Sequence, residues 1–236
     1  MNCKKFFGIF VKSLKDIVRN PKLILPGIFL WILLFFLSMI GRIIAPSLQS
    51  NAANISWVIL FSILNLAIGG FVFAGLIGMA KKGDKGSLKD FVKNSKQFWF
   101  GNFLILILFV VLYNVINLLL YAYTKIILAL PFEISVKMFQ AIAFLIGFCW
   151  IAGIFLFFMF SNFYLVIENL KIKKAIGKSF SLVKKEYVST LLTGIIFFIL
   201  FYVINLIPES SASIIKIVFV MPFLGVVLTR FVLENK

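Results

Sequence analysis

This chain of 236 residues is 62 % hydrophobic and has a mean hydropathy of +1.10. A soluble domain is roughly 45–50 % apolar, and a soluble core of this size could not hide so much apolar surface. The sequence therefore indicates an integral membrane protein. The formal net charge of +16 would favour nucleic acid as the partner of a soluble protein. Here the basic residues flank the apolar stretches, so we expect anionic lipid headgroups as partners and no nucleic acid.

Six apolar stretches are long enough for a helix to cross a bilayer, which takes about 20 residues. In chain order they are residues 23–44, 55–80, 102–123, 138–167, 188–207 and 213–233. Each is too long and too continuously apolar for a strand of a membrane β-barrel. We therefore predict an all-α integral membrane fold with six transmembrane helices. The fourth stretch exceeds the bilayer thickness, so we expect that helix to tilt or to project into the cytoplasm.

The distribution of lysine and arginine predicts the orientation. Twenty of these residues lie in segments 1–22, 81–101 and 168–187 or near the C-terminus, on one side of the predicted spans, and four lie on the other side. Loops rich in lysine and arginine stay on the cytoplasmic side. We therefore expect a multi-pass protein of the cell (cytoplasmic) membrane with both termini in the cytoplasm.

Each of the three basic segments carries apolar residues at three- and four-residue spacing, which places them on one helix face. The apolar faces are Phe6, Phe10, Leu14, Ile17 and Val18 in the first, Leu88, Phe91, Val92, Phe98 and Trp99 in the second, and Ile172, Ala175, Ile176, Leu182 and Val183 in the third. We predict three cytoplasmic amphipathic helices that lie in the headgroup plane.

Lysines on the opposite faces of these helices are the candidate contacts to anionic lipid. They are Lys12, Lys15, Lys89, Lys93, Lys174, Lys178 and Lys185. Such helices either sense or shape lipid, or serve as ordinary interfacial connectors that extend their lysines to the headgroups. Both interpretations stay open.

Short matches in a consistent order indicate an internal repeat. Residues 10–13 match 91–94, residues 115–118 match 203–206, and residues 166–169 match 232–235. The repeat units would be about 1–82, 83–170 and 171–236 within a single polytopic membrane domain. Each unit contains two spans, so the units share one orientation and form a threefold parallel repeat. Many secondary transporters are instead built from inverted repeats.

The residue types that usually carry chemistry are scarce. The chain has no histidine, and its two cysteines are Cys3, near the N-terminus, and Cys149, in the fourth span. No glycine-rich phosphate-binding motif occurs. We expect a protein that is not an enzyme, with no catalytic residue, no metal site and no cofactor.

Two glutamates end spans at the predicted cytoplasmic surface and are each followed by asparagine: Glu168 and Glu234. A carboxylate there could act on lipid headgroups. The alternative is that each glutamate ends its span and pairs with a neighbouring lysine such as Lys171 or Lys236.

Asparagines are the main polar residues inside the spans. Asn114 and Asn117 are three residues apart on the third span, and Asn205 has the position of Asn117 in the next repeat. They are candidates for a polar intramembrane site. The favoured alternative is that they form hydrogen bonds between transmembrane helices, as asparagine commonly does in membranes.

Small residues at four-residue spacing mark the second span at Gly70, Ala74 and Gly78. Such a stripe lets another helix approach closely. It favours packing within the chain, with a homo-oligomer or a membrane-protein partner as the alternative. In the last span, Pro222 lacks a backbone donor and predicts a kink.

Residues 20–26 lead from a basic segment into the first span, and residues 166–184 combine the acid Glu168, a short basic helix and the central Ser179. These stretches and the six-span layout resemble uncharacterised prokaryotic membrane protein families, which include the membrane domain fused to some glycerophosphodiester phosphodiesterases. The resemblance implies a membrane module of unknown role. The chain has no soluble phosphodiesterase domain, so it does not imply that activity. We expect Ser95 and Ser179 to be small packing residues.

The leading functional hypothesis is a non-enzymatic membrane module that organises lipid or partner proteins through its basic segments. The first alternative is a carrier or permease component for a lipid-like or uncharged solute, using Asn117 and Asn205. The second is a membrane-embedded lipid enzyme that uses Glu168, which the absence of histidine makes the weakest of the three.

Overall fold

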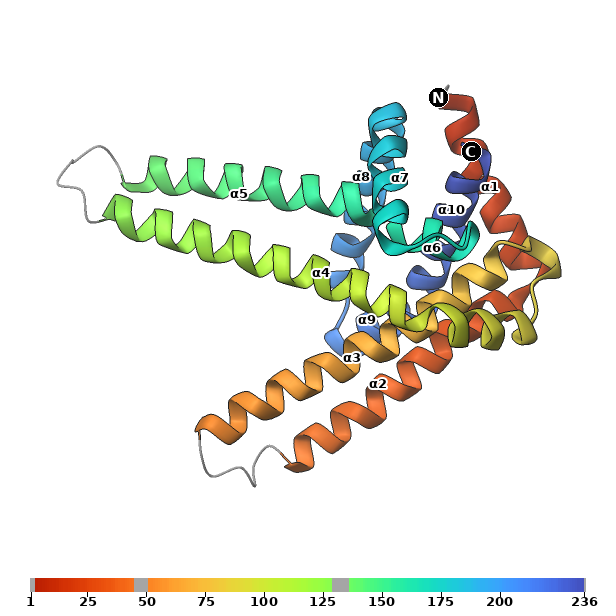
Figure 1. The fold of residues 1–236 in the computed structure, drawn as a ribbon, viewed down its shortest axis with the longest axis horizontal. Coiled ribbons are helices and arrows are strands. Elements are labelled where there is room, and N and C mark those ends of the chain that lie inside the picture. The colour runs from red at the N-terminus through yellow and green to blue at the C-terminus, as the bar shows by residue number, and fades with distance from the viewer. Residues whose placement is uncertain (1–2, 45–50, 129–135, 236) are drawn as a thin grey trace.

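The computed structural model describes residues 3–44, 51–128 and 136–235, and every regular element in these ranges is helical. The elements are α1 (Cys3–Arg19), η1 (Pro21–Ile24), α2 (Leu25–Ile44), α3 (Asn51–Ala80), η3 (Gly83–Lys85), α4 (Leu88–Leu128), α5 (Val136–Met159), α6 (Ser161–Ile167), α7 (Ile172–Lys185), α8 (Tyr187–Asn205), α9 (Glu209–Ile215), η4 (Lys216–Val220) and α10 (Met221–Glu234) (Figure 1). Within the described residues, six helical stretches are long and apolar enough to cross a membrane, as predicted.

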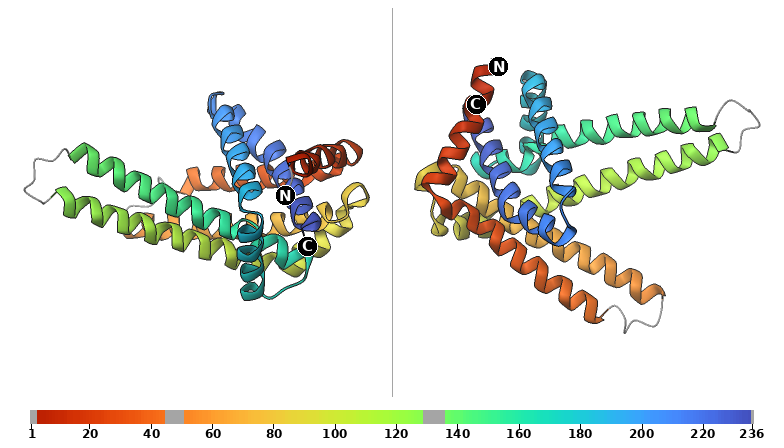
Figure 2. Two further views of the ribbon diagram at one scale, coloured as in Figure 1. Left: turned by 90° about the horizontal axis from the view of Figure 1, so that it is seen from above. Right: turned by 180° about the vertical axis from the view of Figure 1, so that it is seen from behind.

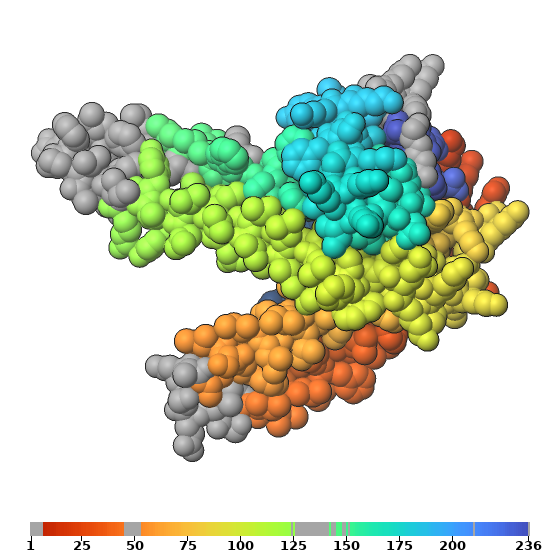
Figure 3. All heavy atoms as spheres, in the orientation of Figure 1, coloured from red at the N-terminus to blue at the C-terminus, as the bar shows by residue number. Residues whose placement is uncertain are grey.

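Helical hairpins extend from one end of the molecule, and their far ends diverge (Figures 1 and 2). α2 packs on α3, α4 packs on α5, and α8 leads through α9 and η4 into α10. The space-filling view shows an open wedge between the α2–α3 and α4–α5 hairpins (Figure 3). We call the end where the hairpins converge the base. It consists of α1, α6, α7, the N-terminal part of α4 and the C-terminal ends of α3 and α10.

The centre of the base is formed by α6 and the ends of α3 and α10, which all contact one another. Phe163 of α6 meets Phe73 of α3 edge to face, with ring centroids 5.4 Å apart. Phe160, just before α6, stacks on Phe231 of α10 at 5.0 Å. Ile77 of α3 is fully buried in the same cluster. Around this centre, α1 packs on α10, α4 on α3 and α7 on α6.

The fourth span is broken near its end. α5 ends at Met159, the chain turns at Phe160, and α6 begins at Ser161. Every residue of α6 is buried. Burying one large apolar side chain contributes about 1.5–3 kcal/mol, so the turn that brings α6 into the base is favoured over a straight helix. The stretch is thus divided between a long helix and a short buried one, and its expected tilt or projection into the cytoplasm stays a prediction.

The second basic segment does not form a helix of its own. α4 runs without interruption over 41 residues, so this segment forms the first turns of a spanning helix. The first segment is separated from its span by η1, which begins at Pro21, and the third by a turn at Glu186. Proline lacks the backbone donor that would continue a helix, and no proline lies between the second segment and its span. The prediction of a separate amphipathic helix there is wrong.

The last span is irregular where Pro222 predicts a kink. Five residues of η4, Lys216–Val220, have π-helical geometry and come directly before Met221 and Pro222. A proline cannot donate to the carbonyl one turn earlier, and a π-helical turn is one way in which a helix accommodates such a gap.

The glycines of α3 allow α4 to approach closely. A Cβ added at Gly70 would lie 3.0 Å from the backbone nitrogen of Phe103. A Cβ at Gly75 would overlap the Phe91 ring and the Ser95 hydroxyl, and one at Gly78 would overlap the Asn94 side chain. The small-residue stripe therefore packs against a helix of the same chain, as the sequence favoured.

We expect Gly75→Ala to lower the free energy of unfolding in detergent by about 1–3 kcal/mol, because the added methyl overpacks the α3–α4 contact. Gly69→Ala is the matched control, since nothing lies within 4 Å of a Cβ at that neighbouring position on α3. The control should be neutral or slightly stabilising, because alanine favours helix by up to about 1 kcal/mol over glycine. Equal effects of the two variants would contradict the close approach.

Candidate functional site

α1 docks on the base through a face that the sequence pattern did not single out. Ile9, Ser13, Asp16 and Asn20 recur at four- and three-residue spacing, and all four are buried. The predicted apolar face is divided instead. Phe10 and Ile17 are partly buried, whereas Leu14 and Val18 are exposed. The predicted face is therefore shared between the protein and the outer side of α1, and the Phe6 side chain lies outside the described residues.

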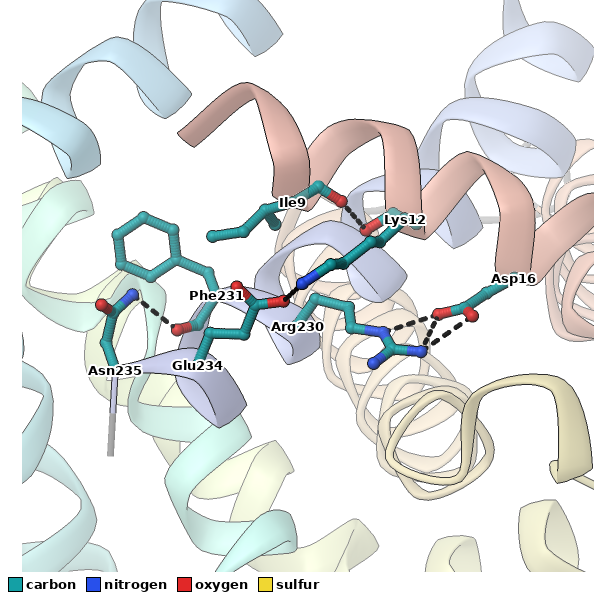
Figure 4. A network of polar contacts seen from close by, with 8 residues as sticks. Ile9, Lys12, Asp16, Arg230, Phe231, Glu234 and Asn235 are labelled. Atoms are coloured by element: carbon teal, nitrogen blue, oxygen red, sulfur yellow. Dashed lines mark hydrogen bonds and ion pairs between the residues drawn. The ribbon is translucent and has the colours of Figure 1, made fainter. Parts of the chain in front are cut away.

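An ion pair between the two ends of the chain holds α1 in place. Nε of Arg230 on α10 donates to Oδ2 of Asp16 at 2.6 Å, and Nη2 donates to Oδ1 at 2.8 Å (Figure 4). The two side chains are only 10 % and 30 % exposed. A bidentate guanidinium–carboxylate pair fixes distance and orientation together, so this contact sets the rotation of α1 about its own axis.

The same helix is held at its C-terminal end by Asn20. Its side-chain amide donates to the carbonyl oxygens of Gly86 at 2.8 Å and Gly83 at 3.4 Å. Gly83 has a φ of +59°, which favours glycine. Asn20 thus joins the end of α1 to the turn that follows α3.

Further ion pairs join the basic segments to the base. Lys12 of α1 lies 2.9 Å from Glu234 at the end of α10 (Figure 4), and Lys178 of α7 pairs with Glu168 after α6. At the junction of α3 and α4 the signs are reversed, because Lys82 pairs with Asp90 at 2.6 Å. Both glutamates therefore contact lysines of the basic segments; the expected pairing with Lys171 or Lys236 stays a prediction. Lys171 is exposed, and Lys236 lies outside the described residues.

Each basic segment also buries one serine completely. Ser13, Ser95 and Ser179 have no exposed surface. The Ser13 hydroxyl donates to the carbonyl of Ile9, and that of Ser179 donates to the carbonyl of Phe157 on α5. Ser95 faces Gly75 of α3. The expectation for Ser95 and Ser179 as packing residues agrees with this placement, whereas Ser13, which the repeat match aligns with Asn94, was not predicted.

The seven lysines named as candidate lipid contacts all lie on the base. Lys12 and Lys178 take part in the ion pairs described above, and both side chains remain more than half exposed. The others are exposed as well: Lys15, Lys89, Lys93, Lys174 and Lys185. The base therefore presents lysines from α1, from the start of α4 and from α7.

Two of the three candidate asparagines have hydrogen bonds within their own hairpins. Asn114 is exposed and donates to the carbonyl of Val110, one turn earlier on α4. Asn117 is partly buried. Asn205, at the end of α8, accepts a hydrogen bond from Lys216 in η4. The Asn205 contact joins the two halves of its hairpin, and the polar intramembrane site stays a prediction.

No protein-family model, curated protein or solved structure matches this chain in the comparisons. The resemblance to the phosphodiesterase-associated membrane domains therefore stays a prediction. Within the described residues, no three histidine, cysteine, aspartate or glutamate side chains converge as metal ligands would.

We expect Asp16→Asn to lower the free energy of unfolding by about 3 kcal/mol, because it leaves the Arg230 guanidinium partly buried without its charged partner. Lys12→Gln is the matched control on the same helix. It breaks the more exposed pair with Glu234 and should cost at most about 1 kcal/mol. Denaturant unfolding in one detergent compares the two variants. A loss no larger for Asp16→Asn than for Lys12→Gln would show that the buried pair does not hold α1.

Proposed function

We propose that this is a multi-pass protein of the cell membrane, with both termini in the cytoplasm, whose base organises anionic lipids without catalysing a reaction. The observation that carries the proposal is that three basic segments meet at the base. Exposed lysines of α1, α4 and α7 lie next to helices that are long and apolar enough to span a membrane. Lysines beside a membrane surface attract anionic headgroups.

The arrangement of the base supports the proposed threefold parallel repeat. The contacts of α1 with α10, α4 with α3 and α7 with α6 each join a basic segment to the end of an inner span. Each basic segment has a fully buried serine. Each junction also has an ion pair, although its signs are reversed between α3 and α4. Three equivalent basic segments would surround the base with similar positive surfaces.

The ion pairs support a role in holding lipid, because they hold the basic helices in place and leave most of their lysines unneutralised. On α7, Lys178 pairs with Glu168, while Lys174 and Lys185 are exposed. The apolar side of α7 is packed on the protein, where Phe180 stacks on Phe157 with centroids 4.4 Å apart. A helix held in this way presents its lysines at a constant height relative to the spans.

We expect Lys174→Gln combined with Lys185→Gln to weaken the retention of phosphatidylglycerol by roughly 30-fold, because each lysine near an anionic surface contributes about 1 kcal/mol. These substitutions leave the Lys178–Glu168 pair in place. Native mass spectrometry of the purified protein, titrated with phosphatidylglycerol and with phosphatidylcholine, measures the retention.

Arg42→Gln combined with Lys125→Gln is the matched control. It removes the same charge from exposed positions at the far ends of the hairpins, so it should leave phosphatidylglycerol retention unchanged. If both double variants lost phosphatidylglycerol retention equally, retention would depend only on the net charge of the protein. That result would contradict a lipid site on the base. Retention of a discrete solute instead of lipid would favour the carrier hypothesis.

A further inference from the structure

The outer side of α1 is an apolar ridge. Phe7, Val11, Leu14 and Val18 recur at four- and three-residue spacing and are 61 %, 53 %, 55 % and 73 % exposed. At 3.6 residues per turn, this ridge lies about half a turn from the face that docks on the base. The docking contacts of Asp16 and Asn20 hold the helix in this rotation, so the ridge is turned away from the protein.

The two remaining sides of α1 differ in polarity. Lys12, Lys15 and Arg19 lie about a quarter turn from the ridge, and Phe10 and Ile17 lie about a quarter turn from it on the other side. All three basic residues are exposed. The helix therefore has four distinct sides, of which one docks on the protein, one is basic and two are apolar.

Phe10 shows which way these sides face. Its ring lies 6.2 Å from that of Phe197 on α8 and 6.3 Å from that of Phe223 on α10. Both partners belong to stretches that are apolar enough to span a membrane. The Phe10 side therefore faces the spans, and the basic side lies opposite to it on the helix, with Lys12 reaching Glu234 at the end of α10. The exposed ridge lies between these two directions and points sideways, out from the rim of the base.

We infer that α1 is a membrane anchor whose ridge inserts among the acyl chains of the leaflet at the base, while Lys15 and Arg19 contact the phosphates of anionic lipids. This inference rests on the proposed function and assigns it a particular element. The order of basic side, apolar ridge and spans matches the order of headgroups and acyl chains in a leaflet. Four exposed apolar side chains beside three basic ones fit anionic lipid by charge and polarity together.

The third basic segment, α7, has no such ridge. On α7, Ala175, Leu182 and Val183 are buried against the protein. Its exposed positions are a glycine, a serine and lysines such as Lys174 and Lys185. α7 can therefore hold headgroups only by charge, whereas α1 combines charge with insertion.

Spin labels on the full-length protein test the insertion. In a background with Cys3→Ser and Cys149→Ala, a nitroxide is attached at Val11→Cys on the ridge and, as the matched control, at Lys15→Cys on the basic side. The protein is placed in nanodiscs of phosphatidylcholine with phosphatidylglycerol. We expect the label at position 11 to collide several-fold more with oxygen, which concentrates in the acyl region, and several-fold less with a water-soluble nickel chelate than the label at position 15.

A label at position 11 that is as accessible to the nickel chelate as the one at position 15 would overturn the inference, because the ridge would then face water. The ridge would then be a surface for a soluble protein. A folding check by circular dichroism and by gel filtration accompanies both labelled proteins, and Leu14→Cys provides a second ridge position if Val11→Cys does not fold.

The charge in the proposal is tested separately. Lys15→Gln combined with Arg19→Gln should lower phosphatidylglycerol retention several-fold and leave phosphatidylcholine retention unchanged. Unchanged phosphatidylglycerol retention would overturn the assignment of anionic lipid to α1. If only the α7 double variant lowers retention, the proposed function stands without α1 as its anchor. If only the α1 variant does, the anchor stands and the role of α7 fails.

Discussion

The contact among α6 and the ends of α3 and α10 is the interaction on which the rest of the structure depends. Phe73, Phe160, Phe163 and Phe231 join three inner helix ends that come from distant parts of the chain. Each of these ends then supports one peripheral segment, which is α4, α7 or α1. The hairpins can diverge beyond the base because their apolar surfaces suit lipid as well as protein. Close packing is therefore concentrated at the base.

Charge acts at the rim of this core in two ways. The bidentate pair between Asp16 and Arg230 is largely buried and fixes the rotation of α1, so it has a structural role. The pairs of Lys12 with Glu234 and Lys178 with Glu168 are more exposed, and exposed pairs contribute little to stability. These two ion pairs instead hold in position the helices that carry the remaining lysines. The proposed lipid surface thus depends on a small number of carboxylates to hold a large excess of positive charge in place.

Much of the fold could be predicted because its causes are local in the sequence. The hydrocarbon of a bilayer requires a long apolar stretch whose backbone groups are paired within the helix, so the number of spans follows from apolar length alone. The glycine stripe at Gly70 and Gly78 could be predicted to pack because a missing side chain leaves room whatever the neighbour is. For the site, the positions of lysines such as Lys174 and Lys185 on an exposed helix side followed from helical periodicity.

By itself, the sequence determined the helical class, the number of helices long and apolar enough to span a membrane, and the basic segments, since each depends on residues that are near one another in the chain. Only the tertiary structure decided that the second segment continues into α4, that the chain turns at Phe160, and that α1 docks through Ser13 and Asp16 with Leu14 and Val18 facing outward. The physical reason is that periodicity locates an apolar face but not its neighbour. Acyl chains and a protein interior accept the same side chains, and the choice between them depends on contacts such as that of Asp16 with Arg230, 214 residues away in the chain.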